Sequence, residues 1–428
     1  MDDQTLPCGQ ARARHGVLWL AIASIVLYFL ALTIFNNGTI ADEEHHLRAI
    51  RWFCDGHWRP PDFLPMLPGY HVLAAVPARV FGTQLVVLRA LNTLLAIGAI
   101  LLVHRILRVM NGPNPDDALL HFAWNPLLLP FMALVYTDLP AMLSLVGAVY
   151  LHVRRRFVLS ALVLLAACLL RQSNVVWVAF MAVWAVVELR QERFPDSKSQ
   201  SSAGLGGFLR RAALRVWPHL ALGLLAAAFF LVHGQATLGD VRLNGPAVNV
   251  AQFYLFALFV ALLWAPVWVR CLRTQWRTVY RPALMRPLVW ALLTAAAAFL
   301  VLNFDNPHPW NEDLRDLKNW PLVAMSSSLA ARLIGVLLIV AAIPIVARFT
   351  WGQPHRRMLA VIWLFSLLFL LPQWLAEPRY YIIPVFLLNL FAAYTPSQAR
   401  WVTIWYGVAG AATATVACIW GGAAGGVW

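Results

Sequence analysis

The sequence predicts an all-α protein that crosses a membrane many times. Of its 428 residues, 61% are hydrophobic and only 12% are charged, and the mean hydropathy is +0.67. A soluble domain carries about 25% charged and about 45–50% apolar residues. This composition excludes a soluble enzyme, a secreted disulfide scaffold and a disordered regulator. At about 20 residues per span, the chain accommodates roughly 12 or 13 transmembrane helices.

The apolar runs that predict these spans follow one another with short polar breaks. They lie at about 17–35, 84–104, 118–135, 139–152, 157–170, 175–189, 217–234, 250–269, 287–303, 330–347, 358–375, 380–395 and 401–420. The first run is long for a signal peptide and no small-residue cleavage site follows it, so we expect it to be retained. We treat 1–428 as a single membrane domain with a long first loop, 36–83, and a flexible loop rich in Arg, Ser and Gly, 190–216.

The charges alternate with the spans in a way that fixes the topology. If Arg12 and Arg14 are cytoplasmic, about twenty of the 33 basic residues fall on the cytoplasmic side, as the positive-inside rule requires. The net charge of +14 therefore reports topology, and we expect no nucleic-acid partner. The acidic residues gather on the other face, which makes that face the candidate chemical site. No internal repeat of the kind common in transporters is present.

The first loop begins with a pair of acids directly after the first span. Residues 42–54 have helical spacing and predict a helix lying on the membrane surface, with Asp42 near its N-cap. Asp42 and Glu43 are then either capping and solvated acids, or a carboxylate base held at the membrane–water boundary. Neighbouring His45 and Asp42 form the one plausible pair of metal ligands, and we predict no metal site. A proline-rich stretch leads to a second short interfacial or re-entrant helix, about 70–82.

Four further polar segments lie at span ends. They are Tyr136-Thr137-Asp138, Arg171-Gln172-Ser173-Asn174, the stretch 303–313 with Asp305 and His308, and Glu377-Pro378-Arg379. Each is interpretable as a loop or interface anchor, but polar residues among apolar ones are costly unless they are paired or face water. Five scattered cysteines predict neither a disulfide framework nor a metal cluster. No phosphate-binding loop, zinc-protease or serine-hydrolase motif appears.

Taken in order, these segments resemble those of one known family. The matching pieces are Asp42-Glu43, Leu67-Pro68-Gly69, Tyr136-Thr137-Asp138, Arg171-Gln172-Ser173-Asn174-Val175-Val176-Trp177, Gly239-Asp240, Asp305-Asn306 and Arg379-Tyr380-Tyr381-Ile382-Ile383-Pro384. The sequence is similar to the polytopic GT-C glycosyltransferases of the endoplasmic reticulum that add the terminal α-1,2-linked glucose to the lipid-linked oligosaccharide. Those enzymes use dolichyl-phosphate-glucose as the donor.

The resemblance implies a GT-C-like fold and an inverting transfer of a hexose from a polyprenyl- or dolichyl-phosphate-sugar to a glycan acceptor, without a cofactor. A carboxylate serves such a reaction as base, and cations stabilise the leaving phosphate. We assign Asp42 as the base, with Glu43 orienting it or the acceptor, and Arg379 and Arg171 as ligands of the donor phosphate. The predicted substrate-positioning residues are Asp138, Gln172, Asn174, Asp240, Asp305 and His308.

Two alternatives and a question of location stay open on sequence alone. One alternative is a GT-C transferase of mannose, arabinose or an amino-sugar. The other is a non-enzymatic lipid or solute transporter, which would carry its polar residues at mid-membrane depth. Lys198 and Lys318 are the only lysines, and this arginine bias favours a bacterial inner membrane with a periplasmic site. The alternative is an endoplasmic reticulum membrane with a lumenal site.

Overall fold

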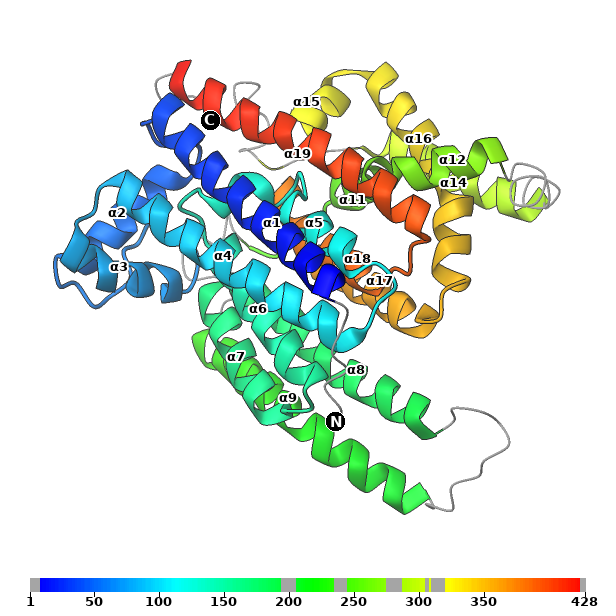
Figure 1. Ribbon diagram of the computed structural model, residues 1–428, viewed down its shortest axis with the longest axis horizontal. Coiled ribbons are helices and arrows are strands. Elements are labelled where there is room, and N and C mark those ends of the chain that lie inside the picture. The colour runs from blue at the N-terminus through cyan, green and yellow to red at the C-terminus, as the bar shows by residue number, and fades with distance from the viewer. Residues whose placement is uncertain are drawn as a thin grey trace.

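The protein is a bundle of helices of very different lengths. It is described by a computed structural model that covers residues 8–193, 205–234, 245–274, 287–304, 308 and 320–423. Every regular element in these ranges is helical, which confirms the predicted fold class (Figure 1). Helices α1, α4 and α19 run alongside one another, while the short helices are spread over the molecule, with α2 and α3 at the left and α12 at the right of Figure 1.

In chain order the elements are α1 (Cys8–Phe35), α2 (Glu43–Cys54), α3 (Gly69–Phe81), α4 (Leu85–Met110), α5 (Pro115–Ala123), η1 (Leu129–Met132), α6 (Asp138–Val153), α7 (Phe157–Leu170), η2 (Gln172–Asn174), α8 (Val175–Arg193), α9 (Leu205–His233), α11 (Val250–Leu263), α12 (Ala265–Thr274), α14 (Pro287–Leu302), α15 (Trp320–Ser327), α16 (Leu329–Trp351), α17 (Arg356–Leu370), η6 (Pro378–Tyr381), α18 (Ile382–Phe391) and α19 (Pro396–Ala423). The elements written η are single 3₁₀ turns.

Fewer helices have the length of a full span than the apolar runs predict. In the described ranges six helices are long and apolar enough to cross a membrane, and a bent pair raises the number to seven. Helices α6 and α7 are apolar but shorter, with 16 and 14 residues. The chain is therefore an integral membrane protein in which several apolar runs fold as short or broken helices.

Proline breaks the run expected to span at about 118–135. Helix α5 ends at Ala123, and the chain continues through an irregular segment with the single turn η1 before α6 begins. Pro126 and Pro130 lie in this segment, and proline removes a helical hydrogen bond and clashes with the preceding turn. The predicted single helix is wrong here, and the broken segment carries Tyr136 and Thr137 to the start of α6.

Two other predicted elements differ from the structure. The run at about 250–269 forms α11 and α12, which meet at an angle of 66° close to Pro266. The segment 190–216 is not a loop throughout, because α8 continues to Arg193 and α9 begins at Leu205. Glu192, near the end of α8, forms ion pairs with Arg155 in the turn between α6 and α7, at 2.6 Å, and with Arg215 of α9, at 2.9 Å.

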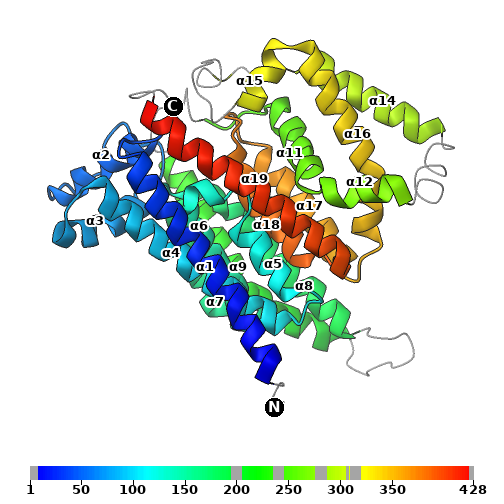
Figure 2. The same ribbon diagram turned by 45° about the horizontal axis from the view of Figure 1, so that its top comes forward.

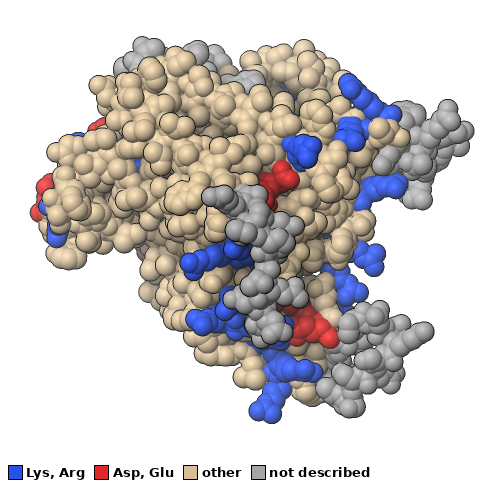
Figure 3. Space-filling view, in the orientation of Figure 1, with Lys and Arg blue, Asp and Glu red and all other residues tan. Residues whose placement is uncertain are grey.

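The two short helices of the first loop lie where the sequence places them. Helices α2 and α3 pack against each other at one side of the molecule, next to the end of α4 (Figures 1 and 2). Helix α19 packs against α1 and α5 and runs alongside α1, so the C-terminal helix lies beside the first one. In the face shown in Figure 3, most of the described Arg side chains lie over the lower and right-hand parts of the molecule, away from α2 and α3.

Membrane topology gives the first prediction. In a cysteine-free background, Glu44→Cys and Asp62→Cys should react with a membrane-impermeant maleimide only from the extracytoplasmic side. Arg154→Cys and Arg210→Cys should react only from the cytoplasmic side, and all four positions are exposed. Labelling of Glu44→Cys and Arg210→Cys from the same side would show that the alternation of spans is wrong.

Candidate active site

Five charged side chains from four separate segments meet at the end of the bundle that carries the first loop. Arg379 is central: its Nη1 lies 2.9 Å from Asp42 Oδ2 and 4.0 Å from Asp138 Oδ2. Its Nε donates to a carboxylate oxygen of Glu377. Arg171 Nη1 donates to the other oxygen, Oδ1, of Asp138. We call this group of five the carboxylate–arginine cluster.

The cluster is largely shielded from water, and its charges depend on one another. The Asp138 and Glu377 side chains are only 4% and 3% exposed, whereas that of Asp42 is 29% exposed. Burial opposes the charge of Arg379, but the carboxylates of Glu377 and Asp42 outweigh it and hold the pKa of Arg379 well above its usual value. Burial lowers the pKa of Arg171 to about 10, so both guanidiniums are charged at neutral pH.

The first loop is fixed to the membrane helices by a buried ion pair. Glu43 and Arg89 of α4 are 0% and 1% exposed, and Arg89 donates from Nε and Nη2 to the two oxygens of Glu43 at 3.1 and 2.5 Å. The same oxygens accept the backbone N–H groups of Ile40, at 2.9 Å, and Val135, at 2.8 Å. Glu43 therefore points toward Arg89 in the protein interior, and Asp42, its neighbour, points toward Arg379.

Backbone contacts set the position of Asp42. It occupies the N-cap position of α2, as the sequence predicts, but its side chain makes no capping hydrogen bond and pairs with Arg379 instead. Its backbone N–H donates to the hydroxyl of Tyr136 at 2.8 Å. The preceding Ala41 has a φ of 51°, the left-handed conformation that turns the chain sharply into α2.

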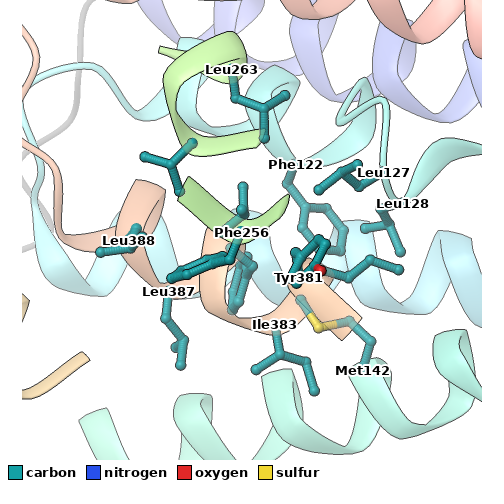
Figure 4. Close-up of a cluster of buried hydrophobic side chains, with 14 of the residues drawn as sticks. Phe122, Leu127, Leu128, Met142, Phe256, Leu263, Tyr381, Ile383, Leu387 and Leu388 are labelled. Atoms are coloured by element: carbon teal, nitrogen blue, oxygen red, sulfur yellow. The ribbon is translucent and has the colours of Figure 1, made fainter. Parts of the chain in front are cut away.

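The short turn that carries Arg379 is anchored in the apolar core. Pro378 opens the turn η6, and Tyr381, at its end, is fully buried. The Tyr381 hydroxyl donates to Gln252 Oε1 at 2.8 Å, and its ring lies in the apolar cluster with Phe256 and Ile383 (Figure 4). Because Tyr381 anchors η6, the Arg379 side chain starts from a fixed backbone position.

The Arg171–Asn174 segment and the Leu67-Pro68-Gly69 stretch are contact partners. Gln172 donates from Nε2 to the Pro65 carbonyl at 3.3 Å and accepts the Leu67 N–H at Oε1, at 3.2 Å. A Cβ on Gly69 would lie only 2.5 Å from the carbonyl oxygen of Leu169, so glycine is required where α3 meets the end of α7. Both ends of the Gln172 amide thus fasten the first loop to the turn that presents Arg171.

The other predicted substrate-binding residues are buried in neighbouring segments or fall outside the described residues. Asn174 is fully buried, and its Nδ2 donates to the Ala167 carbonyl at 2.9 Å. His308 is buried against Trp374, with ring centroids 4.7 Å apart. Asp240 and Asp305 fall outside the described residues. Their roles stay predictions.

Three features of the site were missed in the sequence. The sequence gives Glu377 no role of its own, yet its carboxylate accepts a hydrogen bond from Arg379 Nε. Tyr136 supports Asp42 through its hydroxyl, and its ring lies 5.6 Å from the Arg379 guanidinium carbon. His46, rather than His45, faces inward and pairs with His71, Nδ1 to Nε2, at 2.9 Å.

The histidine pair carries no charge near neutral pH. Burial is the main cause that lowers the pKa of His46 to about 3, and it lowers the pKa of His71 as well. Within the described ranges, no three His, Cys, Asp or Glu side chains are arranged to hold a metal ion. Metal independence stays a prediction.

A small cavity adjoins the cluster. Asp138, Arg171, Arg379 and Tyr380 line it together with apolar side chains of α6, α17 and α18, and its volume is about 10 Å³, room for about one water molecule. Asp138 Oδ2 is buried at this place without a hydrogen-bond partner. The cavity therefore offers an acceptor oxygen and two cations to a polar group of a ligand.

These features define a class: a polytopic helical membrane protein with a carboxylate–arginine cluster at the ends of several helices. Residues 37–390 match the DIE2/ALG10 family, and the chain belongs to this family. The family resemblance predicted from the motifs is confirmed.

Several relatives carry one name, Dol-P-Glc:Glc(2)Man(9)GlcNAc(2)-PP-Dol alpha-1,2-glucosyltransferase. The Arabidopsis thaliana protein is 26% identical, and the match covers 90% of this chain and 93% of the relative. The Candida albicans protein is 23% identical, with 86% and 89% covered. A Homo sapiens protein is 22% identical, with 87% and 88% covered.

The buried ion pair gives the second prediction. Glu43→Gln and Arg89→Met should each lower the free energy of unfolding by about 3–5 kcal/mol, because each leaves an uncompensated buried charge. The double variant should lose less unfolding free energy than the sum of the losses in the two single variants. Chemical unfolding of purified protein in detergent micelles measures the difference.

The matched control is Glu192→Gln, which breaks the exposed pairs with Arg155 and Arg215. It should cost no more than about 1 kcal/mol. Strictly additive losses at Glu43 and Arg89 would show that the two side chains do not act as a pair.

Proposed function

We propose that this protein transfers glucose from a dolichyl- or other polyprenyl-phosphate-glucose to a lipid-linked glycan, forming an α-1,2 linkage, at the carboxylate–arginine cluster. Its family and the shared activity of the named relatives make it a glycosyltransferase. The observation that carries the proposal is the cluster itself, where Asp42 lies 2.9 Å from Arg379 and Arg171 lies beside Asp138. In this proposal the cluster lies at the membrane surface, at the depth of the lipid phosphates, and supplies a base and two cations there.

In the proposed reaction, an acceptor hydroxyl attacks the anomeric carbon of the donor sugar. The proton of that hydroxyl moves to the Asp42 carboxylate as the new C–O bond forms. The bond between the anomeric carbon and the phosphate oxygen breaks, and the lipid phosphate leaves with the electron pair. Arg379 and Arg171 stabilise the charge that develops on this phosphate.

The remaining residues take positioning roles in this proposal. Glu43 acts through its pair with Arg89, which fixes the backbone that carries Asp42. Asp138 Oδ2, which has no hydrogen-bond partner in the protein, accepts a hydrogen bond from a hydroxyl of the donor sugar, because the cavity beside it has the size of one such group. Gln172 holds the first loop in place. Asn174, whose backbone N–H donates to the Arg171 carbonyl at 3.0 Å, and His308, which packs against Trp374, support the surrounding segments.

The relatives also bear on the location. They come from yeast, plant and human, which favours an endoplasmic reticulum membrane with a lumenal site over a bacterial inner membrane with a periplasmic site. The cluster lies at helix ends, at the start of α6 and the end of α7. A transporter with mid-membrane polar residues on broken helices fits this placement less well.

Removal of the base gives the third prediction. Asp42→Asn should lower the single-turnover rate of transfer about 10²–10⁴-fold, because the amide keeps the shape of the side chain and cannot accept the proton. The variant should remain monodisperse, since the side chain makes no capping hydrogen bond. The assay uses purified protein, a polyprenyl-phosphate-glucose donor and a lipid-linked glycan.

Asp62→Asn is the control for this experiment. Asp62 is exposed in the same loop, so the Asp62→Asn variant should lose far less activity than Asp42→Asn. If Asp42→Asn turns over normally while Asp138→Asn is inactive, the base is Asp138 and Asp42 only positions substrate.

Arg379 gives the fourth prediction. Arg379→Ala should lower kcat/KM about 10²–10³-fold, the cost of losing a charge-assisted contact to the leaving phosphate. Arg379→Lys should restore only part of the lost kcat/KM, because an ammonium group lacks the planar fork of a guanidinium. If Arg379→Ala kept full activity, the phosphate ligand would be Arg171 rather than Arg379.

A further inference from the structure

A buried pair of histidines lies next to the carboxylate–arginine cluster. His46 of α2 and His71 of α3 are buried, and His46 Nδ1 lies 2.9 Å from His71 Nε2. The centroid of the His46 ring lies 5.2 Å from that of Tyr136, which also contacts Asp42 and Arg379. The backbone N–H of His46 donates to the Asp42 carbonyl at 3.1 Å, so His46 follows the proposed base by one helical turn.

The neutral state of the pair limits where its protons can lie. Burial is the main cause that lowers the pKa of both rings, so neither ring is charged near neutral pH. A neutral imidazole has one nitrogen that bears a proton and one that does not. One ring must therefore donate to the other across the 2.9 Å contact. The direction of this bond determines what the two outer nitrogens, His46 Nε2 and His71 Nδ1, offer to their surroundings.

The surroundings of His71 decide the direction of the bond. His71 Nδ1 is buried and has no hydrogen-bond partner among the described residues. If His46 were the donor, this nitrogen would bear an N–H without an acceptor, an arrangement that is rare in protein interiors. If His71 donates from Nε2, its Nδ1 is an acceptor without a donor, which proteins tolerate more often. The second arrangement places the proton of His46 on Nε2.

Building on the proposed function, we propose that His46 Nε2–H binds the acceptor sugar, at a hydroxyl next to the one that Asp42 deprotonates. His71 is then a positioning residue, which keeps the proton of His46 on Nε2. The two nitrogens of an imidazole point in nearly opposite directions, so His46 Nε2 is directed away from His71 and from α3. Side chains four residues apart on a helix have Cβ atoms about 5–6 Å apart, so one sugar ring can contact both Asp42 and His46. A neutral N–H suits a neutral hydroxyl, whereas the guanidiniums serve the lipid phosphate.

Two substitutions of His46 separate substrate binding from a structural link between α2 and α3. Asparagine places its amide where the ring has Nδ1, within reach of His71, and glutamine places its amide where the ring has Nε2. With short-chain polyprenyl-phosphate-glucose and a lipid-linked glycan as substrates, His46→Asn should raise the KM for the glycan about 3- to 10-fold, the cost of one neutral hydrogen bond. His46→Gln should stay closer to the wild-type value, and the KM for the donor should remain within about twofold in both variants. The control is His45→Asn, the exposed neighbour, which should change neither KM by more than about twofold.

The position of the protons is measured separately on the wild-type protein. ¹⁵N NMR of protein labelled at histidine, in detergent micelles, distinguishes a ring nitrogen that bears a proton from one that does not. His46→Gln and His71→Gln assign the two sets of signals. We expect the proton of His46 on Nε2 and that of His71 on Nε2. A proton on His46 Nδ1 overturns the inference, even if a His46 variant fails to fold.

The kinetic outcomes separate this inference from the proposed function. A glycan KM that rises more in His46→Asn than in His46→Gln supports the binding role. The opposite order, equal values or no change, in a wild-type protein that transfers glucose, shows that the ring only ties α2 to α3 and overturns the inference alone. A wild-type protein that transfers no glucose to the glycan overturns the proposed function, whatever the NMR spectra show.

Discussion

The buried ion pair between Glu43 and Arg89 is the interaction on which the rest of the site depends. Arg89 also donates to the carbonyls of Asn36, at 2.6 Å, and Gly38, at 2.8 Å, while Glu43 accepts the N–H of Val135. One charge pair thus ties the end of α1, the start of α2, the middle helix α4 and the segment before α6. A buried pair of this kind contributes little net stability but selects one arrangement, because any other would bury the charges without partners.

That arrangement is what brings chemistry from distant parts of the sequence to one place. Val135 precedes Tyr136, whose hydroxyl receives the N–H of Asp42, and the same segment begins α6 at Asp138. Gln172 fastens the opposite side of the first loop to the turn that carries Arg171. The short helices α2 and α3 are therefore part of the site's frame rather than a flexible cover over it.

The sequence predicts the membrane class, the two short helices of the first loop and four members of the cluster, because composition, periodicity and motif order are local properties. It does not distinguish the tasks of adjacent residues. Asp42 and Glu43 are equivalent acids in the sequence, and only the position of Arg89, 46 residues away from Glu43, turns one inward. His45 and His46 pose the same difficulty, and the partner that settles it, His71, lies in another helix. Apolar runs likewise predict spans, but Pro126 and Pro130 decide where a run breaks.

The chemistry of the cluster favours a donor whose leaving group needs no proton. Hydrolysis or transfer from an ordinary glycoside uses one carboxyl group as an acid, held in surroundings that favour its protonated form, and a second one as base or nucleophile. Here Asp42, Asp138 and Glu377 each face a guanidinium, the natural partner of a carboxylate anion. All three therefore lie beside a cation, whereas such an acid requires surroundings that keep it protonated. A phosphate leaves as an anion and is served by the arginines directly, so three carboxylates around two arginines suit a lipid-phosphate sugar better than a glycoside.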